Sequence, residues 1–312
     1  MKLISFYAHG AVRAGCIHED QVIDLNLACR KMLESQGKLR AAQIADAHVP
    51  ADMTELLQGG DESLEMAREA AKFVLQNENS NGEPKAVYAR SEVKLAAPVP
   101  KPGKIICVGH NYREHILEMK RELPEHPVIF AKFANTVIGP EDPIPYYPIT
   151  QQLDYEAEFT FVMGKRARNV KQAEALDYVA GYTIVNDVSY RDLQRRTIQW
   201  LQGKTVDGSA PMGPWLVTRD ELKNPHELEI FLTVNGEERQ RSNTKNLVFN
   251  VNFLVEFLSG IMTLEPGDVI CTGTPGGVGV ARDPQVFLKD GDVVRVEIER
   301  IGALENTVRT AQ

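Results

Sequence analysis

The feature that most constrains the fold of this chain is residues 153–164, LDYEAEFTFVMG, where acidic and apolar side chains alternate. Successive side chains of a β-strand point to opposite faces, so Asp154, Glu156 and Glu158 share one face of a predicted strand. The other face is apolar and consists of Tyr155, Ala157, Phe159 and Phe161. Carboxylates on one face repel each other, and keeping them charged and partly buried is unfavourable unless a cation lies between them.

A third carboxylate, Asp187, lies near the end of a second strand-like run, GYTIVNDVS. Three carboxylates without a paired histidine or cysteine form an all-oxygen set, which suits Mg²⁺ or Mn²⁺ better than Zn²⁺. Three protein oxygens around an octahedral ion leave positions open for water or for a chelating substrate. A solvated strand edge beside an unrelated aspartate explains the same pattern equally well, because acidic residues two positions apart are common.

Composition restricts the class of protein. The 312 residues suffice for two domains or one large one, and the apolar and charged fractions are ordinary for a globular protein. The formal net charge of −8 argues against a nucleic-acid partner, which would favour a basic surface. No apolar run approaches the roughly 18 residues of a membrane span, so we expect no membrane association. The cysteines lack any framework or metal-ligand spacing, which predicts reduced thiols in a cytoplasmic protein. They are Cys16, Cys29, Cys107 and Cys271.

The chain divides into two predicted domains. Short strands occupy the first 27 residues, Asn26 is placed to cap a following helix, and residues 62–77 have helical spacing. The proline-rich connection at 92–104 predicts a boundary near residue 97, which gives domains of residues 1–96 and 97–312. The second domain is rich in strands with a turn about every ten residues, which favours a rolled or barrel-like β architecture with a few peripheral helices.

Three further motifs have both functional and ordinary interpretations. His115 and Glu118 lie three apart in REHILEM, so on a helix they share a face, where a carboxylate can orient an imidazole as a general base. A solvated pair is the commoner case. Lys204 could hold a substrate carboxylate or stabilise an enolate, although most lysines face water. The run TGTPGGVG lacks the spacing of a nucleotide-binding loop, but its N–H groups and the Thr274 hydroxyl could face an anion, and a plain turn explains it equally well.

Taken in order, five segments of the chain resemble the fumarylacetoacetate hydrolase family, and most closely its acylpyruvate hydrolase and oxaloacetate decarboxylase branch. They are NYREHILEM, LDYEAE, VNDVSYRDLQ, GKTVDGSAPMGPW and LEPGDVICTGTPGGVG, and the match covers roughly residues 98–308. The resemblance implies an α+β protein: a mixed β-roll catalytic domain of the fumarylacetoacetase C-terminal type behind a smaller N-terminal α+β domain. It also implies a homodimer.

The resemblance assigns roles to particular residues. It implies that the metal ligands are Glu156, Glu158 and Asp187. It implies that His115 and Glu118 form a catalytic dyad on a lid, and that Lys204 is catalytic. It implies that the substrate-binding residues are Arg191, Gln194, Lys204 and Thr274. One departure is Tyr190, where family members often have a smaller residue, and we expect it to affect packing or pocket size.

The function implied by the resemblance is a Mg²⁺- or Mn²⁺-dependent hydrolase or lyase that cleaves C–C bonds. Its substrates would be 2-oxo acids with a second carbonyl group at position 4, as for an oxaloacetate decarboxylase or acylpyruvate hydrolase, through a metal-stabilised enolate. Glu118 would orient His115, which would activate a water in the hydrolase reaction. One alternative is a 2-hydroxyhepta-2,4-diene-1,7-dioate isomerase or related decarboxylase in aromatic-acid catabolism. Another is a regulatory protein that docks a partner through the N-terminal domain.

Overall fold

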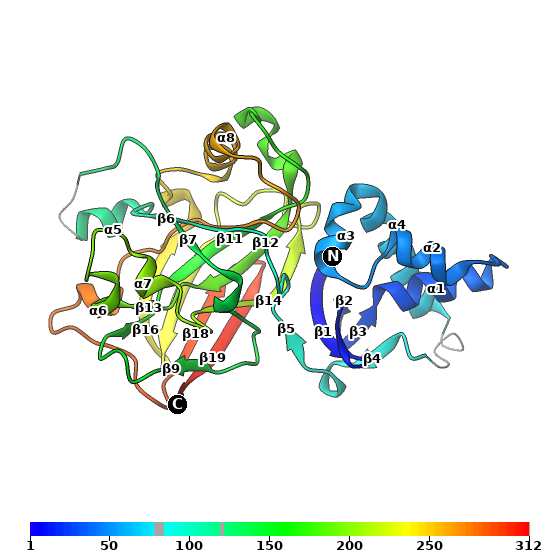
Figure 1. The fold of residues 1–312 in the computed structure, drawn as a ribbon, viewed down its shortest axis with the longest axis horizontal. Helices are drawn as coiled ribbons and strands as arrows, with labels where there is room; N and C mark the ends of the chain where they lie inside the picture. The colour runs from blue at the N-terminus through cyan, green and yellow to red at the C-terminus, as the bar shows by residue number, and fades with distance from the viewer. Residues whose placement is uncertain (78–83, 119–121, 312) are drawn as a thin grey trace.

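The computed structural model describes residues 1–77, 84–118 and 122–311, apart from the side chains of residues 115, 117 and 118. The N-terminal helices lie at one end of the molecule and the strands of the second half at the other (Figure 1). The N-terminal elements are β1 (Lys2–Ala8), β2 (Ala11–His18), β3 (Gln21–Asp24), α1 (Leu25–Ser35), α2 (Ala41–His48), α3 (Met53–Gln58), α4 (Gly60–Gln76), β4 (Val87–Ala89) and β5 (Leu95–Ala96).

Helix α1 is capped by Asp24 and not by Asn26, which corrects the sequence prediction. The Asp24 carboxylate accepts a hydrogen bond from the backbone N–H of Leu27 at 3.0 Å, which satisfies a donor that the first turn leaves free. Asn26 instead donates to the Asp46 carboxylate at 3.0 Å and to the Val49 carbonyl at 2.9 Å. Its amide therefore ties α1 to α2 and to the residue that follows α2.

The second half carries most of the strands. These are β6 (Ile105–Gly109), β7 (Val128–Lys132), β8 (Val137–Ile138), β9 (Ile144–Tyr146), β10 (Leu153–Asp154), β11 (Ala157–Met163), β12 (Val179–Asn186), β13 (Ser189–Tyr190), β14 (Ala210–Thr218), β15 (Glu229–Val234), β16 (Glu237–Asn243), β17 (Val269–Cys271), β18 (Val293–Ile298) and β19 (Gly302–Thr310). The α-helices between them are α5 (Arg113–Glu118), α6 (Arg191–Gln194), α7 (Leu201–Lys204) and α8 (Val251–Ile261). Among the described residues, no helix has the length and apolar character that spanning a membrane requires.

The strands form mixed sheets. The largest runs in the order β4-β3-β2-β1-β14-β12-β11-β17-β6-β7, with β5 beside β1 and β8 beside β14. A second sheet has the order β16-β15-β18-β19-β9, and β10 pairs with β13. Among the described strands, β17–β6, β14–β8 and β19–β9 are parallel pairs and the other pairings are antiparallel. This arrangement confirms the predicted α+β class with a mixed β catalytic domain. The domain boundary near residue 97 stays a prediction.

Alternation along β11 and β12 separates two cores. Phe159, Phe161 and Tyr182 pack into the core that also contains the second sheet and α8. Val162 and Val185 face the opposite way, into a continuous cluster shared with α1 to α4. Because side chains two apart point to the same face, Glu158 lies on the Val162 face of the sheet, as the sequence pattern predicted. The acidic residues therefore lie where a closely packed sheet restricts their contact with water.

Candidate metal and substrate site

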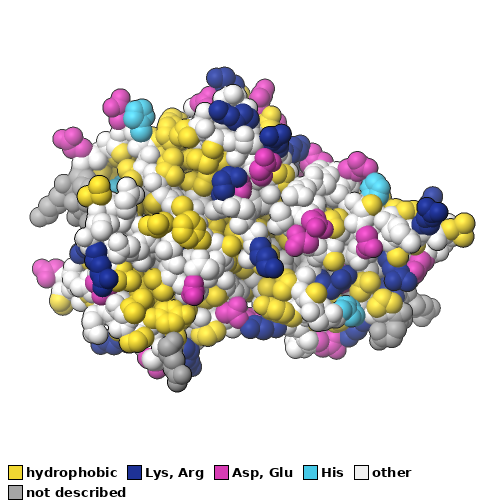
Figure 2. Space-filling model, in the orientation of Figure 1, with side chains coloured by type: hydrophobic (Ala, Val, Ile, Leu, Met, Phe, Trp, Pro, Cys, Tyr) yellow, Lys and Arg dark blue, Asp and Glu magenta, His cyan; other side chains and the backbone are white. Residues whose placement is uncertain are grey.

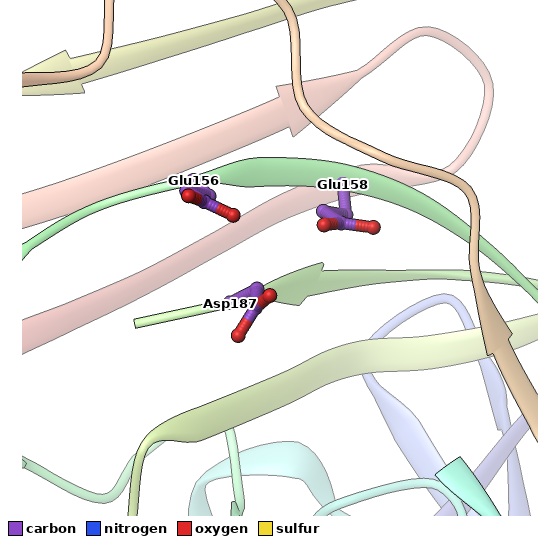
Figure 3. A group of neighbouring side chains, drawn as sticks. All are labelled: Glu156, Glu158 and Asp187. Atoms are coloured by element: carbon purple, nitrogen blue, oxygen red, sulfur yellow. The ribbon is translucent and has the colours of Figure 1, made fainter. Parts of the chain in front are cut away.

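Three carboxylates converge where β11 begins and β12 ends (Figure 3). Ala157 pairs with Asn186 in the antiparallel register of β11 and β12, which sets Glu156 and Glu158 beside Asp187. The Asp187 N–H donates to the Glu156 carbonyl at 2.9 Å, and the Asn186 side-chain oxygen accepts from the Glu156 N–H at 3.0 Å. One oxygen of each of the three carboxylates lies within 4.8 Å of the others, and all three residues are buried. The predicted ligand set is thus brought together.

Three cations compensate part of this negative charge. The Lys204 ammonium donates to Glu156 at 2.8 Å and to Asp187 at 2.6 Å, and it is almost completely buried. Burial alone lowers the pKa of Lys204, but Asp187 and Glu156 outweigh that effect and raise it above its usual value. The Arg191 guanidinium pairs with Glu156 at 2.7 Å, and Lys132 Nζ lies 2.9 Å from Asp187 Oδ1. Lys204 therefore stays charged at neutral pH.

Of the three carboxylates, Glu158 is the one whose negative charge is least compensated by neighbouring cations. In the part of the chain that the structure describes, it has no ion pair, and its oxygen Oε2 accepts one hydrogen bond, at 2.6 Å from the Gly273 N–H. Burial raises the pKa of Glu158 well above its usual range, and the neighbouring Cys271, Asp187 and Glu156 raise it further. A buried carboxylate that faces two other carboxylates fits a divalent cation. Because all the donors are oxygens, the set suits a hard ion.

Asp154 organises the neighbouring turn and was not assigned a role from the sequence. Its carboxylate accepts hydrogen bonds from the backbone N–H groups of Gly279 at 2.8 Å and Val280 at 3.0 Å, and from Arg191 Nε at 2.8 Å. A side chain at Gly279 would place its Cβ 1.9 Å from the Val286 carbonyl oxygen, so the turn requires glycine there. Asp154 therefore holds both the glycine-rich turn and the arginine that pairs with Glu156.

Lys132 is a second residue that the sequence analysis missed. Its side chain lies on β7, is fully buried, and donates to the Lys204 carbonyl at 2.6 Å and to the Ser209 hydroxyl at 3.1 Å. The same ammonium lies beside Asp187, so Lys132 fixes the backbone of Lys204 and one carboxylate together. The sequence signal was a lysine inside the apolar run VIFAKF, which by itself predicts only a strand.

The side-chain oxygens of Thr274 and Gln194 each accept a hydrogen bond from a neighbouring side chain. Each residue then has a donor group that can bind a ligand. Thr274 Oγ1 accepts from Gln240 Nε2 at 2.8 Å, which leaves its hydroxyl proton available. Gln194 Oε1 accepts from Arg191 Nη1 at 3.0 Å, and the Gln194 NH₂ group has no partner among the described residues. Gln240 also accepts from the Ala157 N–H at 2.9 Å, so it connects Thr274 to the carboxylate strand. The sequence gave no sign of this role for Gln240.

A cavity of about 300 Å³ opens onto these groups. The predicted site residues that line it are Glu156, Glu158, Arg191, Gln194, Lys204 and Thr274. The wall also includes His110, Phe130, Arg195, Thr197, Ile198 and Trp200. The side chains of the predicted dyad, His115 and Glu118, lie outside the described part of the structure, although their backbone belongs to α5. Tyr190 is buried in the core and donates to the Pro145 carbonyl at 2.8 Å, so it acts through packing.

Comparison with known proteins defines the class. Residues 104–309 match the family model described as fumarylacetoacetate (FAA) hydrolase C-terminal. An oxaloacetate tautomerase from Xenopus laevis, fahd2, is 45% identical over 278 residues, which are 88% of this chain and 84% of the relative. The oxaloacetate tautomerase YisK from Bacillus subtilis (strain 168) is 40% identical over 296 residues, 94% of each chain. The chain therefore belongs to the fumarylacetoacetate hydrolase family, an enzyme family.

Solved structures agree with this assignment. A putative HpcE protein from Mycobacterium smegmatis has a TM-score of 0.80 at 33% identity over the full length of both chains. Maleylpyruvate hydrolase from Sphingobium sp. SYK-6, solved in complex with manganese(II) and pyruvate, has a TM-score of 0.74 at 28% identity, also over both full lengths. These matches confirm the predicted family and fold. The relatives' substrate, oxaloacetate, agrees with the predicted substrate class, because it is a 2-oxo acid with a second carbonyl group at position 4.

Proposed function

We propose that this enzyme acts on oxaloacetate and related 2-oxo acids that carry a second carbonyl group at position 4. The observation that supports this proposal is a buried cluster of three carboxylates that opens to a cavity lined by the donors of Lys204, Gln194 and Thr274. Two relatives are named oxaloacetate tautomerases, so we add enol–keto interconversion to the C–C cleavage predicted from the sequence. Both reactions pass through the enolate of the 2-oxo acid, and one site can therefore serve both.

We propose Mg²⁺ or Mn²⁺ as the cofactor, held by Glu156, Glu158 and Asp187. The all-oxygen donor set and the manganese in the structure of the Sphingobium relative support this proposal. When bound, such an ion supplies Lewis-acid polarisation of a carbonyl oxygen. The protein's contribution is to hold the carboxylates in place, which Arg191 and Lys132 do for Glu156 and Asp187 through their ion pairs.

The other residues would bind and orient the substrate. The Lys204 ammonium faces the cavity and can hold the negative charge that develops on an enolate oxygen. Gln194 Nε2 and the Thr274 hydroxyl are the remaining donors, and they can donate hydrogen bonds to the oxygens of the 2-oxo acid end and so fix its orientation. The Phe130 and Trp200 rings, with centroids 5.3 Å apart, form the apolar wall that limits water beside these groups.

Proton transfer is assigned to the His115 and Glu118 pair. The two residues lie three positions apart on α5, where side chains share one face of a helix. We propose that Glu118 orients the His115 imidazole, which moves a proton at C3 in tautomerisation and activates water in hydrolysis. His115→Ala should then reduce hydrolysis of acetylpyruvate more than decarboxylation of oxaloacetate, because decarboxylation needs no attacking water. Equal loss of both activities would contradict this role.

The test of the proposed function is turnover by metal-stripped protein before and after addition of Mg²⁺ or Mn²⁺. Ketonisation of enol-oxaloacetate, loss of oxaloacetate and cleavage of acetylpyruvate can each be followed by ultraviolet absorbance. Metal-restored turnover of oxaloacetate or acetylpyruvate is the expected result, and Glu156→Gln should abolish it. Metal-loaded protein with no activity on any of these substrates would overturn the proposal.

A second candidate is isomerisation of a hydroxy-dienedioate. It is supported by the solved 2-hydroxyhepta-2,4-diene-1,7-dioate isomerase from Mycobacterium marinum, with a TM-score of 0.71 at 29% identity. The same chelating end would bind to the same donors. Activity on that dioate with no activity on oxaloacetate would favour this candidate.

We also propose that the enzyme is a cytoplasmic homodimer. Apolar side chains reach the surface in several patches on the face drawn in Figure 2, including the part of the molecule that holds α8. Phe133, Ile149 and Ile198 are at least half exposed in the single chain, which supports burial of such groups against a second copy. The buried free thiols of all four cysteines are compatible with a reducing compartment. Light scattering coupled to size-exclusion chromatography would test the dimer.

A further inference from the structure

The cavity wall contains a cation, Arg195, that has no charged partner among the described residues. Arg195 directly follows α6, and its N–H donates to the Arg191 carbonyl at 3.1 Å, so its backbone is fixed relative to the metal-side arginine. The Arg195 side chain lines the cavity and is solvent-exposed. Among the residues that the structure describes, it makes no ion pair and no side-chain hydrogen bond.

The other cations that line the cavity already form ion pairs with carboxylates. Arg191 pairs with Asp154 and Glu156, and Lys204 pairs with Glu156 and Asp187. Of the lysines and arginines that line the cavity in the described part of the chain, Arg195 is therefore the one without a carboxylate partner, and it can meet a second charge on the substrate. A guanidinium binds a carboxylate through two parallel hydrogen bonds, which gives this contact both strength and direction.

Aromatic side chains lie between Lys204 and the loop that carries Arg195. The Trp200 ring packs edge-on against His110 at 5.4 Å and against Phe130 at 5.3 Å, and the Phe130 ring lies 5.1 Å from Lys204 Nζ. This aromatic row is an apolar surface between Lys204 and the loop that carries Arg195. The Thr197 hydroxyl is used within that loop, because it donates to the Gln199 carbonyl at 2.9 Å. A substrate with an anionic group at each end fits this distribution of charge.

We propose that Arg195 determines specificity by binding the distal carboxylate of the substrate, so that the enzyme prefers dicarboxylic 2-oxo acids to monocarboxylic ones. This inference rests on the proposed action on 2-oxo acids, whose first carboxylate would be bound at the Glu156 end of the cavity. Oxaloacetate carries the second carboxylate, whereas acetylpyruvate ends in a methyl group. In enol–keto interconversion the reacting atoms are C3 and the 2-oxygen, so Arg195 contacts no reacting atom and its effect should fall mainly on KM. In decarboxylation the distal carboxylate is itself the group that leaves, so the test uses the interconversion.

The experiment compares kcat and KM for ketonisation of enol-oxaloacetate and for cleavage of acetylpyruvate in the metal-loaded wild type, Arg195→Gln and Arg196→Gln. Arg196 is the matched control, because it is the next residue, is also exposed, and does not line the cavity. Loss of a charge-assisted contact should lower kcat/KM for oxaloacetate about 10- to 100-fold in Arg195→Gln. Acetylpyruvate should change by less than about twofold. Arg195→Lys should fall between, because it keeps the charge and loses the paired hydrogen bonds.

Calorimetry separates this inference from the proposed function. 2-Oxoglutarate and 2-oxopentanoate differ only in a distal carboxylate, and their binding to metal-loaded protein can be measured without turnover. The wild type should bind 2-oxoglutarate more tightly, and Arg195→Gln should remove that difference while Arg196→Gln keeps it. An unchanged ratio in Arg195→Gln, or an equal loss in Arg196→Gln, would overturn the inference. Inactivity of the wild type on both substrates would overturn the proposed function, and the binding ratio would still decide the role of Arg195.

Discussion

Replacing Glu158 by glutamine is the sharpest test of the metal site. The glutamine carbonyl can still accept the Gly273 N–H, and its NH₂ group would face the Glu156 and Asp187 carboxylates that Glu158 now repels. Metal-free Glu158→Gln should therefore be at least as stable as the metal-free wild type. The same change removes one of the three proposed metal ligands, so the stabilisation by metal should disappear.

The size of that stabilisation can be estimated. At 1 mM Mn²⁺ and a Kd of about 10 µM, binding to the folded state contributes about 2.7 kcal/mol. With an unfolding entropy of about 2.1 cal/mol/K per residue, the 312 residues give about 0.66 kcal/mol/K, and the Tm should rise by about 4 °C. A loss of about 100-fold in affinity leaves about 0.4 kcal/mol, which is a shift below about 1 °C.

The assay is thermal unfolding of both proteins with and without Mn²⁺, with Glu69→Gln at an exposed position as the control.

The pH dependence of stability follows from the raised pKa of Glu158. Between its unfolded and folded pKa values the folded metal-free protein binds more protons than the unfolded chain, so this group lowers stability as pH rises through that window. Metal binding must release that proton, so the Mn²⁺-induced rise in Tm should grow with pH. An undiminished Mn²⁺ shift in Glu158→Gln, or a metal-free variant destabilised by more than about 2 kcal/mol, would refute the argument.

Three further predictions concern the groups around the site. Lys204→Met should abolish turnover and destabilise the metal-free protein by about 3–5 kcal/mol, because Glu156 loses a buried ammonium; Mn²⁺ should restore the Tm but not the activity. Asp154→Asn should lower the free energy of unfolding by about 1–3 kcal/mol and raise KM, because Arg191 and the glycine-rich turn lose the carboxylate that holds them. Unfolding and kinetic measurements test this, and an unchanged Tm would contradict it. Burial raises the pKa of Cys16 to about 12 and of Cys29 to about 11. Labelling of these two thiols by a thiol reagent at pH 8 should therefore be slow until denaturant is added, and rapid labelling of the folded protein would contradict this prediction.

Local patterns were sufficient for the carboxylate strand. The alternation from Tyr155 to Phe161 predicted which side chains enter the core, because a strand has a fixed period and one apolar face must be buried. The sequence analysis predicted Asn26 as the cap of the first helix, but Asp24 caps it. Both residues can cap, and the tertiary hydrogen bonds of Asn26 decide against it.

Residues that act at long range could not be predicted. Lys132 precedes Asp187 by 55 positions and Gln240 follows Ala157 by 83 positions, so no spacing rule connects them. Their positions depend on which strands become neighbours, and that order is not visible in any local pattern. The residue pattern and the family resemblance both pointed to the proposed ligand triad, but neither indicated the lysine and glutamine that hold these carboxylates and Thr274 in place.

The pairing of β1 with β14 has a consequence for any attempt to separate the two halves of the chain. Lys2 is opposite Val217 and Leu3 is opposite Leu216, so the first strand continues the sheet that carries the acidic residues. A truncated chain that begins after residue 96 would expose the hydrogen-bonding edge of β14 together with the apolar side chains that α1 to α4 now cover. Such a fragment would adhere to other proteins whether or not the intact enzyme has a partner. A partner-docking role of the N-terminal part is therefore better tested with surface substitutions on α1 to α4 in the full chain.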